Sequence, residues 1–265
     1  MNYLTKILSI FIFNRLVYAD NVNLNILTNK YVSNEKNNLA RSTINENEVK
    51  LYLSDSPRIY MTEPTTEKYQ LFNLLNRRLE FDIDLSNVPC DYNFALYFSE
   101  MSWCADAVNG KGYCDAQGQG YSCNELDIIE TNKQSAHLAS HSCQNGACDK
   151  DGNFAKFYYR DSNIDVFRPF KIVTEFIMQG DSFTNIKQYY MQDNNVVGPT
   201  LNLFENGVNG GLAEMKNAFS RGMVLIISLW TSGPDGLFWL NGKCERYEVY
   251  NDISGIIRNI KISNL

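Results

Sequence analysis

The chain has 265 residues, of which 44% are hydrophobic and 20% charged, and it carries a formal net charge of −6 at pH 7. Its length and apolar content suffice for one large hydrophobic core. An acidic chain without basic clusters argues against nucleic acid and anionic membrane surfaces as partners, and it favours a neutral ligand.

The N-terminus has the pattern of a secretory signal peptide. Lys6 supplies a positive start, residues 7–13 form an apolar run too short for a bilayer span, and Ala19 ends a small-residue cleavage pattern. We predict a leader over residues 1–19 and a secreted, extracellular protein, with a short buried helix or a membrane anchor as the alternative. Removal of the leader leaves 22 basic and 30 acidic side chains, a formal net charge of −8. Residues 20–265 have no apolar run approaching about 18 residues, so no membrane span is expected there.

The rest of the chain is predicted to be one domain dominated by short β-strands. Residues 29–50 are rich in Asn and in charge, which predicts a long loop or an insertion. The Asn241-Gly242 pair is typical of a hairpin turn, and residues 210–223 have the apolar spacing of one short helix. Alternating patterns or short apolar runs predict strands at residues 80–88, 93–101, 171–178, 186–192, 223–230, 236–242 and 258–265.

Many short strands separated by turns predict an all-β fold, a curved antiparallel β-sandwich with short helical pieces. Curvature would leave one concave face free for a long ligand. Seven cysteines in a secreted chain indicate disulfide bonds and leave one cysteine over. Cys143 and Cys148 bracket a turn-forming segment and could close a small loop.

The segment CNELDIIETN places three carboxylates within six positions of a predicted strand. In a regular strand Glu125 and Asp127 face one side and Glu130 faces the other. One extra residue, a β-bulge at Ile128 and Ile129, would bring all three to the same face, and bulges are frequent beside active sites. Glu125 and Glu130 could then approach to about 5–5.5 Å, the separation found in retaining glycosidases. On this pattern alone, a solvated acidic edge or a metal-binding loop is the commoner explanation.

Several segments, in the same order, resemble glycoside hydrolase family 7, the fungal cellobiohydrolases and endoglucanases. The family's catalytic strand has the pattern E-x-D-x-x-E, then an Asn two residues on and a His two residues before a Cys, as in SCNELDIIETNKQSAHLASHSC. Further similar segments are FDIDLSNVPCDYNFALYFSEM, GKGYCDAQ, GGLAEMKNAFSRGMVLIISLW and RNIKISNL. The resemblance runs from about residue 48 to the C-terminus, and it implies a concanavalin-like jelly roll.

The resemblance implies separate roles for the three carboxylates. Glu125 would be the nucleophile that forms a glycosyl-enzyme intermediate, and Glu130 would be the general acid and later the general base. Asp127 would hydrogen-bond the nucleophile and help set its charge. No cofactor or metal is expected. The substrate-binding candidates are Asn93, Tyr97, Tyr113, Asp115, Gln117, His141, Tyr189, Trp230 and Trp239.

Some of these residues have an ordinary structural alternative. Trp230 and Trp239 match tryptophans that stack on sugar rings, whereas core packing is the common role of a single Trp. Of the two histidines, His141 is assigned to the site and His137 to a structural role. The family's disulfide pattern implies the pairs Cys90–Cys244 and Cys114–Cys123, with Cys143–Cys148 as the third pair and Cys104 left over.

The chain departs from the family in length and in its cleft. It lacks the N-terminal tryptophan segment and most tunnel loops, and Gln188 and Asn241 replace two product-side arginines of cellobiohydrolases. We therefore expect a monomer with an open cleft that cleaves internal β-1,4-glucosidic bonds of cellulose or a related β-glucan. Two alternatives stay open, a non-catalytic, lectin-like protein on the same fold and a retaining hydrolase of another β-glucan. A calcium loop at residues 149–153 is least favoured, because the full twelve-residue ligand pattern is missing.

Overall fold

The computed structural model describes residues 21–22, 32–34, 39–45, 47–63, 68–101, 111–118, 122–145, 147–204, 211–242, 244 and 252–265. The predicted leader and Cys104 lie outside these ranges. The strands are β1 (Asn21–Val22), β2 (Val32–Asn34), β3 (Thr43–Ile44), β4 (Glu48–Tyr52), β5 (Arg58–Met61), β6 (Leu71–Phe72), β7 (Arg77–Asp84), β8 (Asn93–Ser99), β9 (Glu125–Thr131), β10 (Ser135–His141), β11 (Cys143–Gln144), β12 (Ala147–Cys148), β13 (Asn153–Tyr158), β14 (Phe170–Gln179), β15 (Ser182–Gln192), β16 (Asn195–Asn202), β17 (Met223–Trp230) and β18 (Ser254–Asn264).

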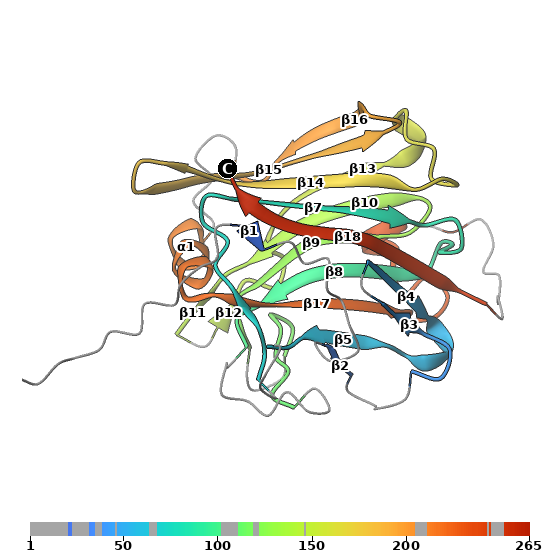
Figure 1. Ribbon diagram of the computed structural model, residues 1–265, viewed down its shortest axis with the longest axis horizontal. Helices are drawn as coiled ribbons and strands as arrows, with labels where there is room; N and C mark the ends of the chain where they lie inside the picture. The colour runs from blue at the N-terminus through green and yellow to red at the C-terminus, as the bar shows by residue number, and fades with distance from the viewer. Residues whose placement is uncertain are drawn as a thin grey trace, which may run out of the picture.

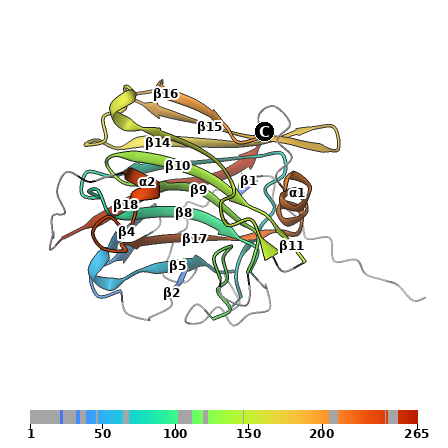
Figure 2. The same ribbon diagram turned by 180° about the vertical axis from the view of Figure 1, so that it is seen from behind.

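These strands form the antiparallel β-sandwich that the sequence predicts. One layer, called the β7 sheet, has the order β16-β15-β14-β7-β18-β4-β3, with β1 also paired to β18. The other, called the β9 sheet, has the order β13-β10-β9-β8-β17-β5-β2, with β6 also paired to β17. Strands β11 and β12 form a separate hairpin. The β7 sheet faces the viewer in Figure 1, and Figure 2 shows the β9 sheet from the opposite side.

The main core lies between the two sheets. On β8, alternation sends Phe94, Leu96 and Phe98 into this core, while the residues between them point to the other face. That other face of the β9 sheet carries a smaller apolar cluster, which includes Tyr97 and Ile226. Strand β8 is therefore buried on both faces, because the smaller cluster covers its side of the outer face of the β9 sheet.

Helices are few and short in the described residues. They are α1 (Leu212–Arg221), α2 (Phe238–Asn241) and two 3-10 turns at Leu53–Asp55 and Tyr159–Asp161. None of these helices is long and apolar enough to cross a bilayer. Helix α1 matches the predicted helix, and it buries Phe219 against Phe176 and Phe183 with ring centroids 5.5 and 5.3 Å apart.

Two element predictions were wrong. The described part of residues 29–50 includes strands β2, β3 and the start of β4, and Val49 is fully buried. Strand β4 alternates buried and half-buried residues and pairs with β18, but this short pattern is difficult to see in an Asn-rich segment. Residues 236–242 form helix α2 instead of a strand and hairpin, because a short apolar run does not separate helix from strand. Gly242 ends that helix with a φ of 70°, which glycine adopts without strain.

Three disulfide bonds join the cysteines that the sequence pairs. Cys90–Cys244 links the segment before β8 to the segment after α2, and Cys143–Cys148 joins β11 to β12. Cys114–Cys123 closes a loop that leads directly into β9. The Cys114–Cys123 bond therefore fixes the loop that lies beside the acidic residues of β9.

Candidate active site

Strand β9 contains the β-bulge that brings the three carboxylates together. The three steps from Asp127 to Glu130 match only two steps on β10, from Ala139 to His137. The extra residue lies at Ile128-Ile129, and the register against β8 shifts at the same place. Both isoleucines are fully buried in the core between the sheets. Glu130 therefore returns to the face that carries Asp127 and, two residues earlier, Glu125.

Glu125 is held by a backbone amide. Its Oε2 accepts a hydrogen bond from Ala116 N at 2.9 Å, and Ala116 belongs to the loop closed by Cys114–Cys123. Within this loop, Cys123 N donates to Asp115 O at 3.0 Å. Burial raises the pKa of Glu125 well above its usual value, and the charge of Asp127 raises it further, while the Ala116 amide opposes the shift.

Asp127 is almost fully buried and lies against His141. The distance from His141 Nε2 to Asp127 Oδ2 is 3.3 Å, and His141 Nδ1 lies 2.9 Å from the backbone oxygen of Asp149. Because a carbonyl oxygen only accepts hydrogen bonds, Nδ1 carries the hydrogen. Burial raises the pKa of Asp127 well above its usual value, and the charges of Glu130 and Asp115 raise it further. Burial therefore favours the protonated form of Asp127 at this position beside His141.

Glu130 lies between an amide and an imidazole. Asn93 Nδ2 donates to Glu130 Oε1 at 2.7 Å, and Asn93 Oδ1 accepts from Thr131 N at 3.2 Å. On the other oxygen, Oε2, His137 Nδ1 lies at 3.3 Å. His137, expected to be a structural histidine, thus contacts the third carboxylate.

A chain of hydroxyl and carboxylate groups connects the loop to β8. Tyr97 OH donates to Tyr113 OH at 3.1 Å, and Tyr113 OH donates to Asp115 Oδ2 at 2.7 Å. Gln117 N donates to Asp115 Oδ1 at 2.9 Å. Burial raises the pKa of both tyrosines, so they stay protonated donors near neutral pH. Because Tyr97 pairs directly with Asp127 across the sheet, the structure places Tyr97, Tyr113 and Asp115 near the carboxylates. Gln117 joins this chain of groups only through its backbone amide.

Aromatic rings flank the Glu130 side of the site. Trp230 is at the end of β17 and pairs with Asn93. Trp239, on α2, is 44% exposed, and its ring centroid lies 5.4 Å from that of His137. Phe154, on the edge strand β13, is 59% exposed and lies 5.3 Å from the same ring. Sequence reasoning missed Phe154, although the alternation in NFAKFY was the available signal for an edge strand.

Three other residues do not lie where the sequence suggested. Tyr189 is on β15 of the β7 sheet, next to Arg78 and Glu175 on that sheet's outer face, so its assignment to substrate binding was wrong. Gln188 is fully buried and Asn241 nearly so. Neither of these two positions reaches a surface where a product could bind.

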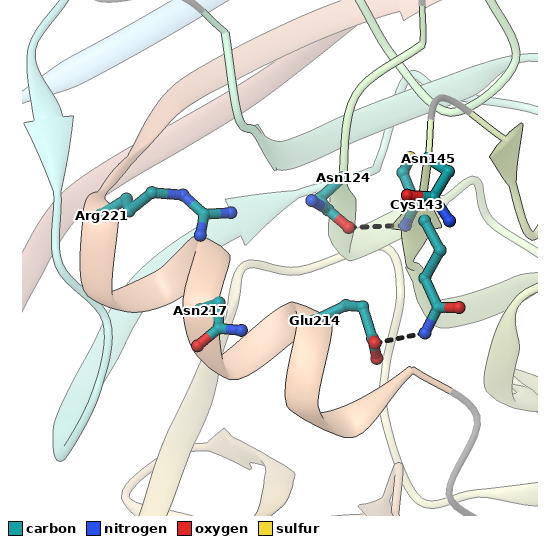
Figure 3. Close-up of a pocket in the computed structure, with 7 residues that line it drawn as sticks. Asn124, Cys143, Asn145, Glu214, Asn217 and Arg221 are labelled. Carbon is teal, nitrogen blue, oxygen red and sulfur yellow. Dashed lines mark hydrogen bonds between the residues drawn. The ribbon is translucent and has the colours of Figure 1, made fainter.

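A polar pocket of about 360 Å³ lies beside α1, at the start of β9 (Figure 3). Asn124 precedes Glu125 but turns away from it, and its Oδ1 accepts from Cys143 N at 2.6 Å. Gln144 donates to Glu214 across the pocket. The three β9 carboxylates are not part of its lining, so the pocket is separate from the acidic site. Its lining residues are Asn124, Cys143, Gln144, Asn145, Glu214, Asn217 and Arg221.

Residues 149–153, considered above as a calcium loop, form a bend that supports His141. Asp149 Oδ1 accepts from Gly152 N at 3.0 Å, and the Asp149 carbonyl holds the imidazole. Among the described residues, Cys90, Asp91 and Cys244 bring metal-ligating atom types together. The two sulfurs are joined in a disulfide bond, so they offer no thiolate to a metal.

The three carboxylates share one face but have different partners. The Ala116 amide opposes the burial that raises the pKa of Glu125, whereas Asp127 is buried among other acids beside His141. Glu130 is oriented by side chains on two neighbouring strands. Such a set can supply a nucleophile, a proton donor and a group that orients the nucleophile.

The chain is similar in sequence to known hydrolases. Residues 23–121 match the profile of glycosyl hydrolase family 7. The chain is 33% identical to endoglucanase type C of Fusarium oxysporum, over 73% of this chain and 62% of that protein. It is also 33% identical to endoglucanase EG-1 of Trichoderma longibrachiatum, over 74% of this chain and 52% of that protein. The chain thus spans about half to three fifths of the length of these curated relatives.

The fold is likewise similar to solved structures. An endoglucanase I complexed with cellobiose superposes with a TM-score of 0.71 at 28% identity, covering 83% of this chain and 77% of that one. Sequence and fold therefore indicate the same family.

Proposed function

Because the chain belongs to glycosyl hydrolase family 7, we propose that it cleaves internal β-1,4-glucosidic bonds of cellulose or a related β-glucan with retention of anomeric configuration. The observation that carries this proposal is the bulge at Ile128-Ile129, which puts Glu130 on the same face as Glu125. A pair of carboxylates on one face is what double displacement needs. The predicted leader favours secretion, so we expect the enzyme to act outside the cell.

The reaction proceeds in two steps. In the first, a carboxylate oxygen of Glu125 bonds to the anomeric carbon while the glycosidic C–O bond breaks, and the Glu130 proton passes to the leaving oxygen. The leaving sugar departs as a free alcohol. In the second step, water attacks the anomeric carbon and gives its proton to Glu130. The bond between the anomeric carbon and Glu125 breaks as the bond to water forms, which restores the Glu125 carboxylate and the protonated Glu130.

The neighbours of the two carboxyl groups fit these roles. The Ala116 amide stabilises the Glu125 charge before attack and after release. Asp127, kept protonated by burial, can donate to a neighbouring oxygen without adding a further negative charge. Asn93 donates to Oε1 of Glu130, so the transferable proton resides on Oε2.

The test measures reducing ends and viscosity after incubation with soluble β-1,4-glucan, mixed-linkage β-glucan and β-1,3-glucan. Glu125→Gln and Glu130→Gln should each lower hydrolysis of β-1,4-glucan by about 10²-fold or more at unchanged melting temperature. The matched control is Glu214→Gln, a half-buried glutamate in the separate polar pocket, and it should keep full activity. A rapid fall in viscosity and first release of the β-anomer would support internal, retaining cleavage. Glycan binding without cleavage by the unmodified chain would contradict the proposal and favour a lectin-like protein.

A further inference from the structure

The Glu130 carboxyl is fixed at both of its oxygens, by side chains from two different strands. Asn93 of β8 donates to Oε1 at 2.7 Å, and His137 Nδ1 of β10 lies 3.3 Å from Oε2. The terminal torsion of a glutamate is broad, so a single contact leaves the carboxyl plane free to turn. Two contacts on opposite strands define that plane.

The imidazole of His137 is itself fixed by two exposed rings. Phe154 lies 5.3 Å and Trp239 lies 5.4 Å from it, measured between ring centroids. Lys156 Nζ donates to the backbone oxygen of Trp239 at 2.7 Å, which ties helix α2 to strand β13. His137 thus sits between the acid group and two aromatic surfaces that a leaving sugar could contact.

We propose that His137 is a positioning residue for Glu130, which orients the Oε2 proton toward the leaving oxygen. This inference rests on the proposed function. Since Asn93 occupies Oε1, the proton that is transferred lies on Oε2, the atom beside His137. Without the Nδ1 contact, the carboxyl turns about its last torsion and the proton leaves the line of transfer. Substrates whose leaving group needs no proton are unaffected by that loss.

Two variants separate this role from simple packing. His137→Phe keeps a ring between Phe154 and Trp239 but removes the nitrogen that contacts Glu130. His137→Asn places an amide nitrogen near the Nδ1 position but removes the ring. If packing were the only role of His137, the phenylalanine variant would be the milder of the two. If it positions Glu130, the asparagine variant is the milder.

The experiment measures kcat/KM for two substrates, with Glu130→Gln as the benchmark. Cellotetraose has a sugar as a poor leaving group, and dinitrophenyl cellobioside has an activated aryl leaving group. His137→Phe should lose about tenfold on cellotetraose and less than about twofold on the aryl substrate, with an unchanged melting temperature. His137→Asn should recover most of the cellotetraose rate. Equal losses on both substrates, or no loss in His137→Phe, would overturn the inference. If the unmodified chain cleaves neither substrate, the proposed function fails and this inference fails with it.

Discussion

The side-chain amide of Gln188, on the β7 sheet, donates a hydrogen bond of 2.7 Å to the carbonyl oxygen of Ile128, the bulge residue of β9. A bulge takes one residue out of the ladder, so its backbone groups need other partners. Gln188 is fully buried, and its Nε2 also donates to Thr174 Oγ1 at 3.0 Å, while Tyr190 OH donates to its Oε1. The opposite sheet therefore completes the hydrogen bonding that the bulge leaves open.

Gln188→Leu should destabilise the fold and impair the site together. The substitution leaves the Ile128 carbonyl and the Tyr190 hydroxyl buried without their partner, which costs about 1–3 kcal/mol in free energy of unfolding. We expect a lower urea midpoint and a several-fold lower kcat on β-1,4-glucan. The comparison variant, Tyr190→Phe, removes one hydrogen bond but keeps the link to Ile128, so it should lower stability and preserve kcat. Equal kcat in both variants would contradict a role for Gln188 in holding the bulge.

The bulge could be predicted as the condition for a shared site, because in a regular strand Glu130 faces away from Glu125 and Asp127. One residue added at Ile128-Ile129 returns Glu130 to the face that carries the other two. The contacts of His137 could not be predicted in this way. They depend on which strand lies next to β10 and on where helix α2 packs, and both are long-range features.

The error at Tyr189 has a local physical explanation. Adjacent residues of a strand face opposite sides, so Tyr189 and Tyr190 cannot share an environment. Tyr190 is fully buried in the core, which places Tyr189 on the outer, solvated face of the β7 sheet. Alternation determines that the two differ, but the identity of the inner one depends on the pairing of β15 with β14.

Asp127→Asn should stabilise the protein at neutral pH. The pKa of Asp127 is raised in the folded chain, chiefly by burial, so its ionisation above a pH of about 4 favours the unfolded state. The wild type therefore loses free energy of unfolding as pH rises through that window, and the asparagine variant does not. Each pKa unit corresponds to about 1.4 kcal/mol, so urea unfolding at pH 7 should show the variant as the more stable one. The difference in stability should vanish below about pH 4, where the Asp127 carboxyl is protonated in both the folded and the unfolded chain.

Asp55 provides the control of opposite sign. Burial opposes the shift, but hydrogen bonds from Ser42 and Arg41 lower the pKa of Asp55, so its charge favours the folded state. Asp55→Asn should therefore lose stability at neutral pH, and this loss should disappear as the pH falls below the usual carboxyl range. If Asp127→Asn behaved like Asp55→Asn, the raised pKa of Asp127 would be refuted.

Loss of the Cys114–Cys123 disulfide should affect activity more than loss of Cys143–Cys148. The first bond holds the loop whose Ala116 amide contacts Glu125, and the chain-entropy stabilisation from so short a loop is about 2–3 kcal/mol. We expect the Cys114→Ser/Cys123→Ser double variant to lose about tenfold in kcat, because the amide no longer lies at a fixed distance. Cys143→Ser/Cys148→Ser should melt earlier and keep most of its kcat. Similar kcat values for the two double variants would contradict this role of the loop.

Phe154→Ala should weaken binding of β-glucan. Phe154 pairs with Ala139 and Ala139 with Asp127, so at about 4.8 Å per strand the backbone of Phe154 lies about 10 Å across the sheet from that of Asp127. Its exposed ring lies beside His137. We expect KM for cello-oligosaccharides to rise about three- to tenfold with a small change in kcat. Phe167→Ala is the control, because Phe167 is 69% exposed and outside the site, and it should leave KM unchanged.

Gly152→Ala should impair the site by displacing His141. Gly152 has a φ of +67°, and a Cβ at this position would lie 2.6 Å from His141 Nδ1 and 2.7 Å from the backbone oxygen of Ser140. The imidazole must move, which breaks its hydrogen bond to Asp149 and its contact with Asp127. We expect kcat on β-1,4-glucan to fall about tenfold or more, since a shift of about 1 Å at a catalytic group can cost up to about 10²-fold.

The matched control for that substitution is Gly180→Ala, in the turn between β14 and β15. Gly180 has a similar φ of +58°, but among the described residues a Cβ there would meet nothing within 4 Å. Both variants therefore carry the same backbone strain of about 1–2 kcal/mol, visible as a lower melting temperature. Only Gly152→Ala adds the collision with His141. Comparable kcat values for the two variants at matched folded fraction would show that Gly152 does not hold His141 in place.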